Sequence, residues 1–130
     1  MENSVVHFEI YGEDQDQLSS FYTSLFDWQA EEIPGMGYRM IKTVETDDRG
    51  RPTKPGGING GMLTRPMLPF RGWLNYVNVA SVDEAVARAR KLNATVVRDK
   101  SPVAGMGWFA ILNDPQGNVF AVWQTDAAAK

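Results

Sequence analysis

The pattern of hydrophobic and polar positions predicts a strand, a helix and three further strands in the first half of the chain. Within residues 5–11, apolar Phe8 and Ile10 alternate with His7, Glu9 and Tyr11, as expected for a strand with one covered face. Asp14 is a suitable cap for a helix to about residue 26, in which apolar residues recur at the helical spacing. Further strands are predicted at residues 28–33, 38–44 and 56–63, with a charged loop at 45–55.

The second half of the chain predicts the same order of elements. A strand at residues 73–79 is followed by a helix at 82–92, for which Ser81 is a suitable cap. Strands are predicted at residues 94–98, 108–112 and 119–124. The last strand follows an Asp-Pro-Gln-Gly turn and is apolar through residue 123, which predicts that both of its faces are covered.

Two anchors indicate that the halves are an internal repeat. Gly-Met-Gly at residues 35–37 recurs 70 positions later at 105–107, and the helices align best at an offset of 67. The alternative is a chance similarity between two hairpins. We favour the repeat, which predicts an α+β fold of two tandem βαβββ modules in one domain, at about residues 4–64 and 73–124 with a linker at about 65–72. One helix covers only one face of each sheet, so the uncovered faces are expected to surround a shared concave site.

Composition narrows the classes of function. The chain is 43% hydrophobic and 22% charged, as in ordinary globular proteins, and its net charge of −3 without a basic stripe gives no reason to expect a nucleic-acid partner. The absence of cysteine excludes disulfides and thiolate metal ligands. No apolar run reaches membrane-spanning length, and the first residues lack a signal-peptide layout, so we expect no membrane partner and a cytoplasmic protein.

Four segments carry a resemblance to a known family. They are HFEI at residues 7–10, FYTSLFDW at 21–28, WLNYVNVASVDEAVARA at 73–89 and DPQGNVFAVW at 114–123. They resemble the vicinal oxygen chelate family, which includes glyoxalase I, bleomycin-resistance proteins and extradiol dioxygenases. The resemblance implies a cup-shaped, curved mixed sheet with the helices outside, often completed by dimerisation. It also implies a divalent metal in the cup, held by residues of each module's first and last strands.

Only one of the metal-ligand positions implied by the resemblance carries a good ligand. His7 matches the first-strand position of the first module, but its counterpart in the second module is Leu74. Ala121 stands where a glutamate is expected in the last strand, and the last strand of the first module contains no carboxylate or histidine. A catalytic metal site normally has about three protein ligands. We therefore expect neither a metal nor another cofactor.

Polar groups on the predicted cup face are candidates for acid–base chemistry or for binding. Glu9 shares the face of His7, and the repeat places Tyr76 at the position equivalent to Glu9. Glu9 or His7 could act as an acid or base, whereas the structural alternative is a set of hydrogen bonds within the fold. Asn78 shares the face of Tyr76 and carries the same two alternatives.

Aromatic residues favour a flat or largely apolar small-molecule ligand. Trp123 shares the face of Ala121, Tyr38 and Trp108 follow the two Gly-Met-Gly turns, and Met62 could add an adaptable apolar surface. Packing in the core is the alternative for each aromatic residue alone. The predicted ligand-binding residues are His7, Glu9, Tyr38, Met62, Tyr76, Asn78, Trp108, Ala121 and Trp123.

Three functions are compatible with these observations. The first is a metal-independent small-molecule-binding protein, similar to the bleomycin-resistance branch. The second is a lyase, an isomerase or a dioxygenase-type enzyme that uses Glu9 or His7, or a rearranged metal site. The third, a purely structural interaction module, leaves the aromatic residues on the predicted cup face unexplained. We expect a symmetric homodimer, because the resemblance implies that dimers are common in the family and a short, apolar-lined cup needs a partner to close it. The loop at 45–55 could be a lid or simply a mobile polar loop.

Overall fold

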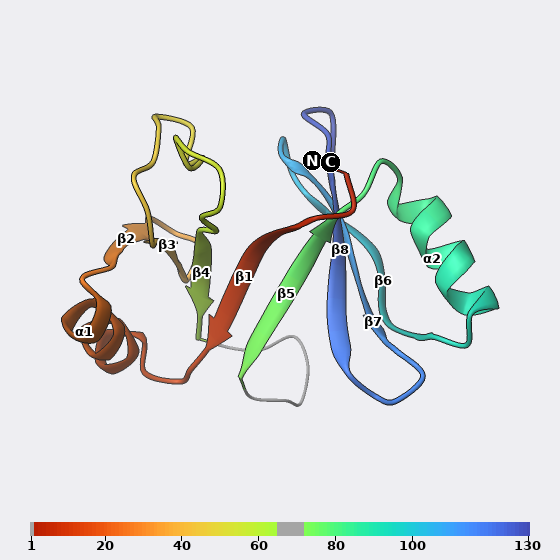
Figure 1. The fold of residues 1–130 in the computed structure, drawn as a ribbon, viewed down its shortest axis with the longest axis horizontal. Coiled ribbons are helices and arrows are strands. Elements are labelled where there is room, and N and C mark those ends of the chain that lie inside the picture. Colours follow the sequence, from red (N-terminus) through yellow and green to blue (C-terminus); the bar gives the residue numbers. More distant parts are fainter. Residues whose placement is uncertain (1, 65–71) are drawn as a thin grey trace. The chain divides into compact units, whose positions relative to one another are not determined.

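The computed structural model describes residues 2–64 and 72–130 (Figure 1). The chain divides into two compact units, which we describe separately: the first module, residues 7–73, and the second module, residues 74–130 together with the segment before His7. That segment joins the second module through two backbone hydrogen bonds, Asn3 N to Asn78 O (2.6 Å) and Asn78 N to Ser4 O (2.8 Å). The predicted linker lies outside the described residues except for Gly72.

The first module has the predicted βαβββ order. It consists of β1 (Val5–Tyr11), α1 (Gln15–Phe26), β2 (Gln29–Ile33), β3 (Tyr38–Lys42) and β4 (Gly60–Leu63). Its strands are ordered β2-β3-β4-β1, with β4 parallel to β1 and the other neighbours antiparallel.

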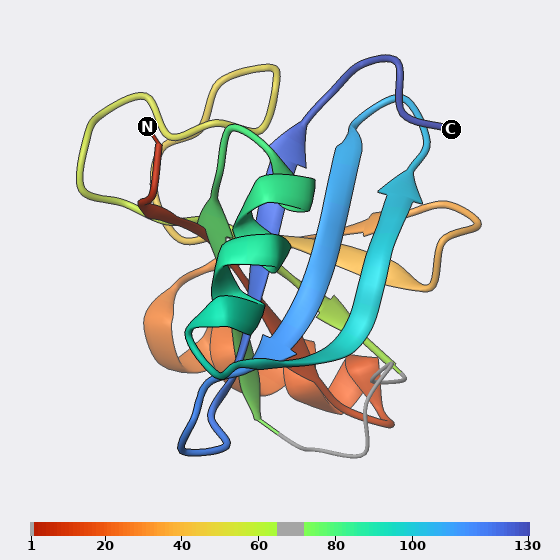
Figure 2. The same cartoon turned by 90° about the vertical axis from the view of Figure 1, so that its right-hand side faces the viewer.

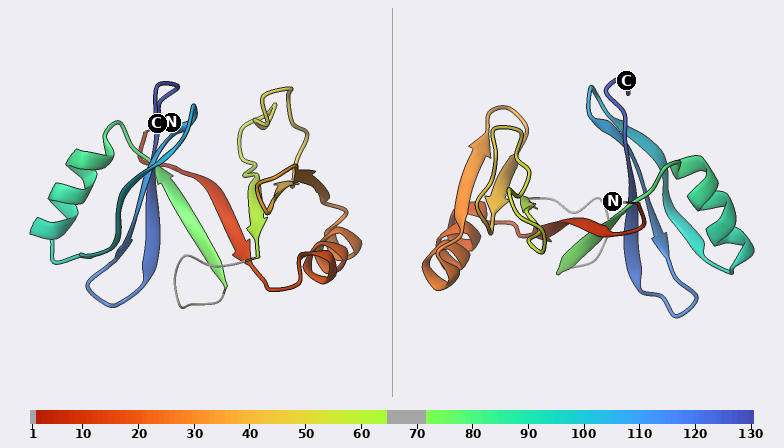
Figure 3. Two further views of the ribbon diagram at one scale, coloured as in Figure 1. Left: turned by 180° about the vertical axis from the view of Figure 1, so that it is seen from behind. Right: turned by 45° about the horizontal axis from the view of Figure 1, so that its top comes forward.

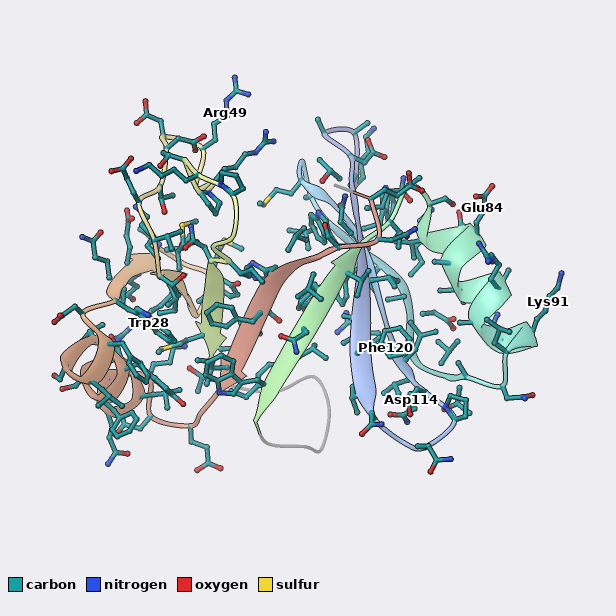
Figure 4. The ribbon with its side chains drawn as sticks, in the orientation of Figure 1. Trp28, Arg49, Glu84, Lys91, Asp114 and Phe120 are labelled. Carbon is teal, nitrogen blue, oxygen red and sulfur yellow. The ribbon has the colours of Figure 1, made fainter. Side chains whose placement is uncertain are left out.

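Helix α1 covers one face of this sheet. The Asp14 side chain accepts a hydrogen bond from Gln17 N (3.0 Å) at the start of the helix, and Asp27 ends it in a left-handed conformation (φ 57°). The buried core on this side consists of Phe8, Ile10, Ile41 and Met62, against which Leu18, Tyr22 and Trp28 pack. Leu18 and Tyr22 are the helix residues that pack on this core, whereas Phe21 and Leu25, at the same helical spacing, are exposed. Trp28 lies next to α1 in Figure 4.

The second module repeats the arrangement. It consists of β5 (Trp73–Asn78), α2 (Val82–Lys91), β6 (Thr95–Val103), β7 (Gly107–Asn113) and β8 (Val119–Thr125), with the strands ordered β5-β8-β7-β6 and β5 parallel to β8. The α+β class and the two βαβββ modules predicted from sequence are therefore confirmed.

Helix α2 lies along one face of the second sheet (Figure 2). The Ser81 hydroxyl accepts a hydrogen bond from Glu84 N (3.2 Å), as predicted for a cap. Val82, Val86, Ala110, Leu112 and Val122 form the buried core between helix and sheet. Glu84 and Lys91 point away from the strands, and Phe120 lies on the helix side of β8 (Figure 4).

The element boundaries differ from the prediction most at two strands, and by one or two residues at several others. Strand β4 begins at Gly60 rather than at residue 56, and β6 extends to Val103 rather than ending at residue 98.

The segment 45–55 forms a doubled-back loop beyond β3 and β4 (Figure 3). The Asp47 carboxylate accepts hydrogen bonds from Arg49 N and Arg51 N, and buried Asn59 donates to the Thr46 hydroxyl (2.8 Å). Among the described residues, no helix has the length and apolar character needed to cross a membrane.

Candidate functional site

Four polar side chains of the first module gather on the face of its sheet away from α1. His7, Glu9 and Tyr11 are alternate residues of β1, and Tyr38 opens β3. His7 Nε2 lies 2.8 Å from the Tyr38 hydroxyl oxygen and 3.7 Å from Glu9 Oε2. The Tyr11 hydroxyl donates to Glu9 Oε1 (3.3 Å). The structure therefore brings together His7, Glu9 and Tyr38, three residues of the predicted ligand-binding set, and adds Tyr11. We call these four residues the His–Glu–Tyr cluster.

Burial controls the protonation of Tyr38 in the His–Glu–Tyr cluster. Burial raises the pKa of Tyr38 far above its ordinary value, and the negative charge of Glu9 and a hydrogen bond with it raise the pKa further. The phenol therefore keeps its proton. Because an ionised carboxylate can only accept, Tyr38 donates to Glu9, and the consistent tautomer has His7 Nε2–H donating to the phenol oxygen. The Glu9 side chain is only 10% exposed, whereas the His7 side chain is 36% exposed, so His7 is the more accessible member of the pair.

A glycine in β4 makes room for Tyr38. Gly61 lies opposite Glu9 in the register, and a Cβ atom built on Gly61 would overlap the Tyr38 hydroxyl and ring. In the second module Ala121 is paired with Tyr76 in the same way, so Gly61 and Ala121 are equivalent positions. At Gly61, the last-strand position equivalent to Ala121, the Tyr38 ring thus fills the space that a side chain of β4 would otherwise take.

Met62 does not belong to this face. Met62 is paired with Ile10, is fully buried and forms part of the core under α1. The prediction that Met62 contributes to a ligand surface with Tyr38 is therefore corrected. Strand β4 begins with two glycines, so its sequence lacks the alternation of apolar and polar side chains that would show which residues face the core.

In the second module, four predicted site residues share the face of the sheet away from α2. Tyr76 is paired with Ala121 and Asn78 with Trp123, and directly paired residues point to the same side of a sheet. The Trp123 ring lies over Gly107, where an added Cβ would approach its Cζ2 atom to 2.6 Å, and its indole N–H donates to the Thr125 hydroxyl (3.1 Å). Tyr76 and Ala121 are buried, whereas Asn78 and Trp123 are partly exposed.

Trp108 lies on the opposite side of the sheet. Its ring packs against the core under α2, and its indole N–H donates to Asp126 Oδ2 (2.9 Å). The prediction that Trp108 lines the ligand site together with Trp123 is therefore corrected. The cause is a shift of one residue between the modules: Gly37 lies in a turn with φ 60°, whereas Gly107 is already the first residue of β7. A shift of one residue moves a strand's side chains to the other face.

Three residues on the face away from α2 were not predicted from sequence. Phe109 is paired with Trp123 and Ile111 with Ala121, and both are buried. Arg98 is aligned with Ile111, and its guanidinium carbon lies 5.2 Å from the centroid of the Phe109 ring. The alternation of β7 could have identified the first two, but the Arg98 contact follows only from the pairing of β6 with β7. We call Tyr76, Asn78, Arg98, Phe109, Ile111, Ala121 and Trp123 the aromatic face.

The residues at the positions implied for a divalent metal do not form a site within either module. Leu74 and Ala121 have no donor atom, and Gly61 has no side chain, with Tyr38 filling its place. In the described part of the chain, no group of three or more His, Cys, Asp or Glu residues is placed to hold a metal ion. His7 is the one good ligand among these four positions.

Each module also has a groove apart from these groups. A cavity of about 420 Å³ in the first module is lined by Asp27, Gln29, Lys42, Thr43, Val44, Glu45 and Thr46. A cavity of about 220 Å³ in the second module lies beside α2 and is lined by Asp83, Val86, Ala87, Arg90, Asp99 and Lys100. Both contain several charged groups, unlike the mostly apolar pockets that small molecules usually occupy.

Comparison with known proteins identifies related sequences. The family model described as a glyoxalase-like domain matches residues 7–123. The proteins named "Putative glyoxylase CFP32" from Mycobacterium bovis and Mycobacterium tuberculosis are each 27% identical over 119 residues, covering 88% of this chain. The chain spans only 41% of the length of these relatives.

Solved structures share the fold at low sequence identity. A glyoxalase/bleomycin resistance protein/dioxygenase superfamily member from Vibrio splendidus has a TM-score of 0.65 at 15% identity, over 95% of this chain and 99% of that one. A Streptomyces coelicolor methylmalonyl-CoA epimerase variant in complex with 2-nitronate-propionyl-CoA has a TM-score of 0.63 at 21% identity, over 100% and 99%. These likenesses support the fold alone. The match of the family model across both modules shows that the chain belongs to the glyoxalase-like domain family, within the vicinal oxygen chelate superfamily.

Proposed function

We propose that this protein binds a small molecule on the aromatic face of the second module, and that it does so without the divalent metal typical of the superfamily. The observation that carries the proposal is the strand register that gathers Tyr76, Asn78 and Trp123 on one side of the sheet, beside Phe109. Apolar and aromatic surface with a few polar groups is the composition of most small-molecule sites. The ligand meets the partly exposed Trp123 and Asn78 first, because the other paired side chains are buried.

The metal-free part of the proposal follows from the donor set. Of the four positions that the superfamily uses, this chain offers an imidazole at one, and hydrocarbon side chains or no side chain at the others. The imidazole is also hydrogen-bonded to Tyr38. We expect purified protein to lack a stoichiometric divalent ion, and a chelator to leave its melting temperature unchanged, because a metal bound to the folded state would stabilise it. A molar equivalent of zinc, nickel, manganese or iron would refute this part.

Binding is tested by a screen of flat aromatic and amphipathic compounds. Compounds that bind the aromatic face should change tryptophan fluorescence and raise the melting temperature together. Trp123→Ala should weaken such a compound by about 1–3 kcal/mol, the scale of a buried aromatic contact. Trp108→Phe is the matched control, since its ring lies on the helix side and should leave affinity unchanged. Equal weakening by both variants would count against this face.

A second candidate function is acid–base catalysis at the His–Glu–Tyr cluster. The observation that favours it is a buried carboxylate hydrogen-bonded to Tyr11 and Tyr38 and connected through Tyr38 to the more accessible His7. In this role Glu9 removes a proton from a carbon acid, and the proton on Glu9 then exchanges with solvent. Exchange of the acidic C–H of an α-substituted thioester in deuterated water, followed by NMR, tests it directly. Glu9→Gln should abolish enzyme-dependent exchange, and unchanged exchange in that variant would exclude Glu9 as the base.

Assembly as a homodimer and a cytoplasmic location stay predictions. Light scattering at micromolar protein concentration tests the first, and a monomer mass would refute it. A purely structural interaction module remains the contrasting hypothesis, and it is favoured if no compound in the screen binds either module.

A further inference from the structure

Large apolar side chains are exposed on the helix side of the first module. Phe21, Leu25 and Phe26 of α1 are each more than half exposed, and Trp73, the last residue of this unit, is 44% exposed. Phe21 and Leu25 lie four residues apart and therefore on one side of the helix. We call these four residues the α1 patch. Apolar groups that gather on an exposed surface commonly mark a site of interaction with a partner.

Ring contacts make the α1 patch continuous. The Tyr22 ring lies edge-on to the Phe21 ring, with centroids 5.1 Å apart, and its centroid is 6.0 Å from that of Trp73. Tyr22 also stacks on Phe26 at 6.4 Å. Phe26 in turn lies 5.0 Å from Trp28, which is seen beside α1 in Figure 4. The exposed rings thus surround Tyr22 and form one surface.

The exposed side of α1 is uncharged. From Gln17 to Phe26 the sequence contains no charged residue, and Asp16, in the first turn, forms an ion pair with Arg39. Surface helices usually carry charged groups on the side that faces water. Two copies of an uncharged surface meet without the repulsion between like charges that opposes the pairing of a charged surface with itself. The α1 patch is therefore electrostatically compatible with a second copy of this chain.

The equivalent helix of the second module shows that the fold does not require these apolar residues. At the repeat offset of 67, Phe21 corresponds to Arg88 of α2 and Ser24 to Lys91, and both basic residues are exposed. Helix α2 nevertheless packs on its sheet through its buried side. The packing of its own module therefore does not explain an apolar residue at position 21, whereas contact with a partner does.

The size of the α1 patch fits a symmetric dimer. A fully exposed side chain of this size offers about 200 Å² of surface, so the exposed fractions leave roughly 400 Å² of apolar surface on one copy. A dimer that covers the patch on both copies would bury roughly 800 Å² of apolar surface. Homodimer interfaces are about 65% apolar, so the whole interface would be about 1,200 Å², the lower end of the range for stable specific complexes.

We propose that the α1 patch is the interface of a symmetric homodimer, in which α1 packs against α1 of a second copy. The patch lies on the helix side of the first module's sheet, away from the face that carries the His–Glu–Tyr cluster. The predicted homodimer thereby receives an interface on the helix side instead of one that closes a cup. The inference does not depend on ligand binding, and the modest area predicts a reversible, concentration-dependent dimer.

Sedimentation velocity of the full chain over a range of micromolar concentrations tests the inference. Wild-type protein should show a concentration-dependent dimer. Phe21→Arg, which introduces the residue type found at the equivalent position of α2, should raise the dissociation constant of the dimer at least about tenfold, because it places an unpaired charge in the interface from each copy. Leu25→Lys should act in the same direction. Leu92→Arg is the matched control, since it replaces an exposed apolar residue at the end of α2 and should leave the dimer unchanged.

Four results would overturn the inference. The first is a wild-type chain that stays monomeric at high micromolar concentration, and the second is a dimer that neither Phe21→Arg nor Leu25→Lys weakens. The third is equal weakening by Leu92→Arg, which would show that the effect is not specific to the α1 patch. The fourth is monomeric wild-type protein that co-sediments with phosphatidylcholine vesicles when Phe21→Arg does not, which would assign the patch to a lipid surface. Melting curves show whether each variant is folded, and if Phe21→Arg is unfolded, Leu25→Lys decides the question.

Discussion

The ring of Tyr38 occupies the space that a side chain at Gly61 would need. A Cβ on Gly61 would overlap the Tyr38 hydroxyl oxygen, and that oxygen lies 2.8 Å from His7 Nε2. Residue 61 faces Glu9 across β4 and β1, so the smallest residue is the one that permits a phenol to reach the carboxylate and the imidazole. The Tyr38–Gly61 pair therefore determines which groups the first module presents on this face.

Gly61→Ala should destabilise the protein because the new methyl group and the Tyr38 ring cannot share one volume. Overpacking of this kind typically costs about 1–3 kcal/mol. In a Tyr38→Ala background the same substitution should cost much less, because the overlapping ring is gone. Denaturant unfolding of the four proteins of this double-mutant cycle measures the coupling. Equal costs of Gly61→Ala in both backgrounds would show that Tyr38 does not fill this space.

Tyr38→Phe should remove a contribution to the free energy of unfolding that is present at neutral pH and declines at alkaline pH. The folded-state pKa of Tyr38 is raised, so the folded chain keeps the phenol proton above about pH 10, where the unfolded chain has lost it. This component is present below that pH and declines above it, by at most about 1.4 kcal/mol for each pH unit. The difference in unfolding free energy between wild type and Tyr38→Phe should therefore shrink above about pH 10. A difference that stays constant from neutral to alkaline pH would contradict a raised pKa.

Trp108→Phe should change the titration of Asp126. The Trp108 indole N–H is the largest influence that lowers the pKa of the Asp126 carboxyl below its usual range, followed by the backbone N–H of Ala128. Without the indole N–H, the pKa of Asp126 should move up toward its usual value. An NMR titration of the carboxyl carbon checks this, with Asp114 as the internal control, because its low pKa is caused by Asn118 and neighbouring backbone groups. An unchanged pKa of Asp126 in Trp108→Phe would contradict the hydrogen bond from the Trp108 indole N–H.

The helices and most strands could be predicted from sequence because helix caps and the alternation of side chains along a strand depend on residues close together in the chain. Asp14 and Ser81 cap the helices as their side-chain chemistry suggests, and each accepts a hydrogen bond from a backbone N–H three residues on. Alternation in β1 predicted that His7 and Glu9 share a face. The repeat offset correctly aligned Glu9 with Tyr76, since each is paired with an equivalent last-strand position, Gly61 and Ala121.

Details that depend on the register between strands could not be predicted. Gly-Met-Gly occurs in both modules, but the strand starts after the tripeptide in one and within it in the other, and this places Trp108 on the helix side. Met62 follows two glycines, so its strand has no apolar alternation to read. The contact of Arg98 with Phe109 joins two strands whose pairing contains shifts in register, which no sequence pattern indicates.

The most direct test of the central claim is NMR mapping of a compound from the screen on protein prepared free of metal. We expect the signals of Asn78, Arg98 and Trp123, including the Trp123 indole N–H, to shift in proportion to occupancy without added metal. Shifts confined to the groove lined by Asp27 and Thr46, or to the groove lined by Asp83 and Lys100, would contradict binding at the aromatic face. Binding that appears only after a divalent metal is added would contradict it as well.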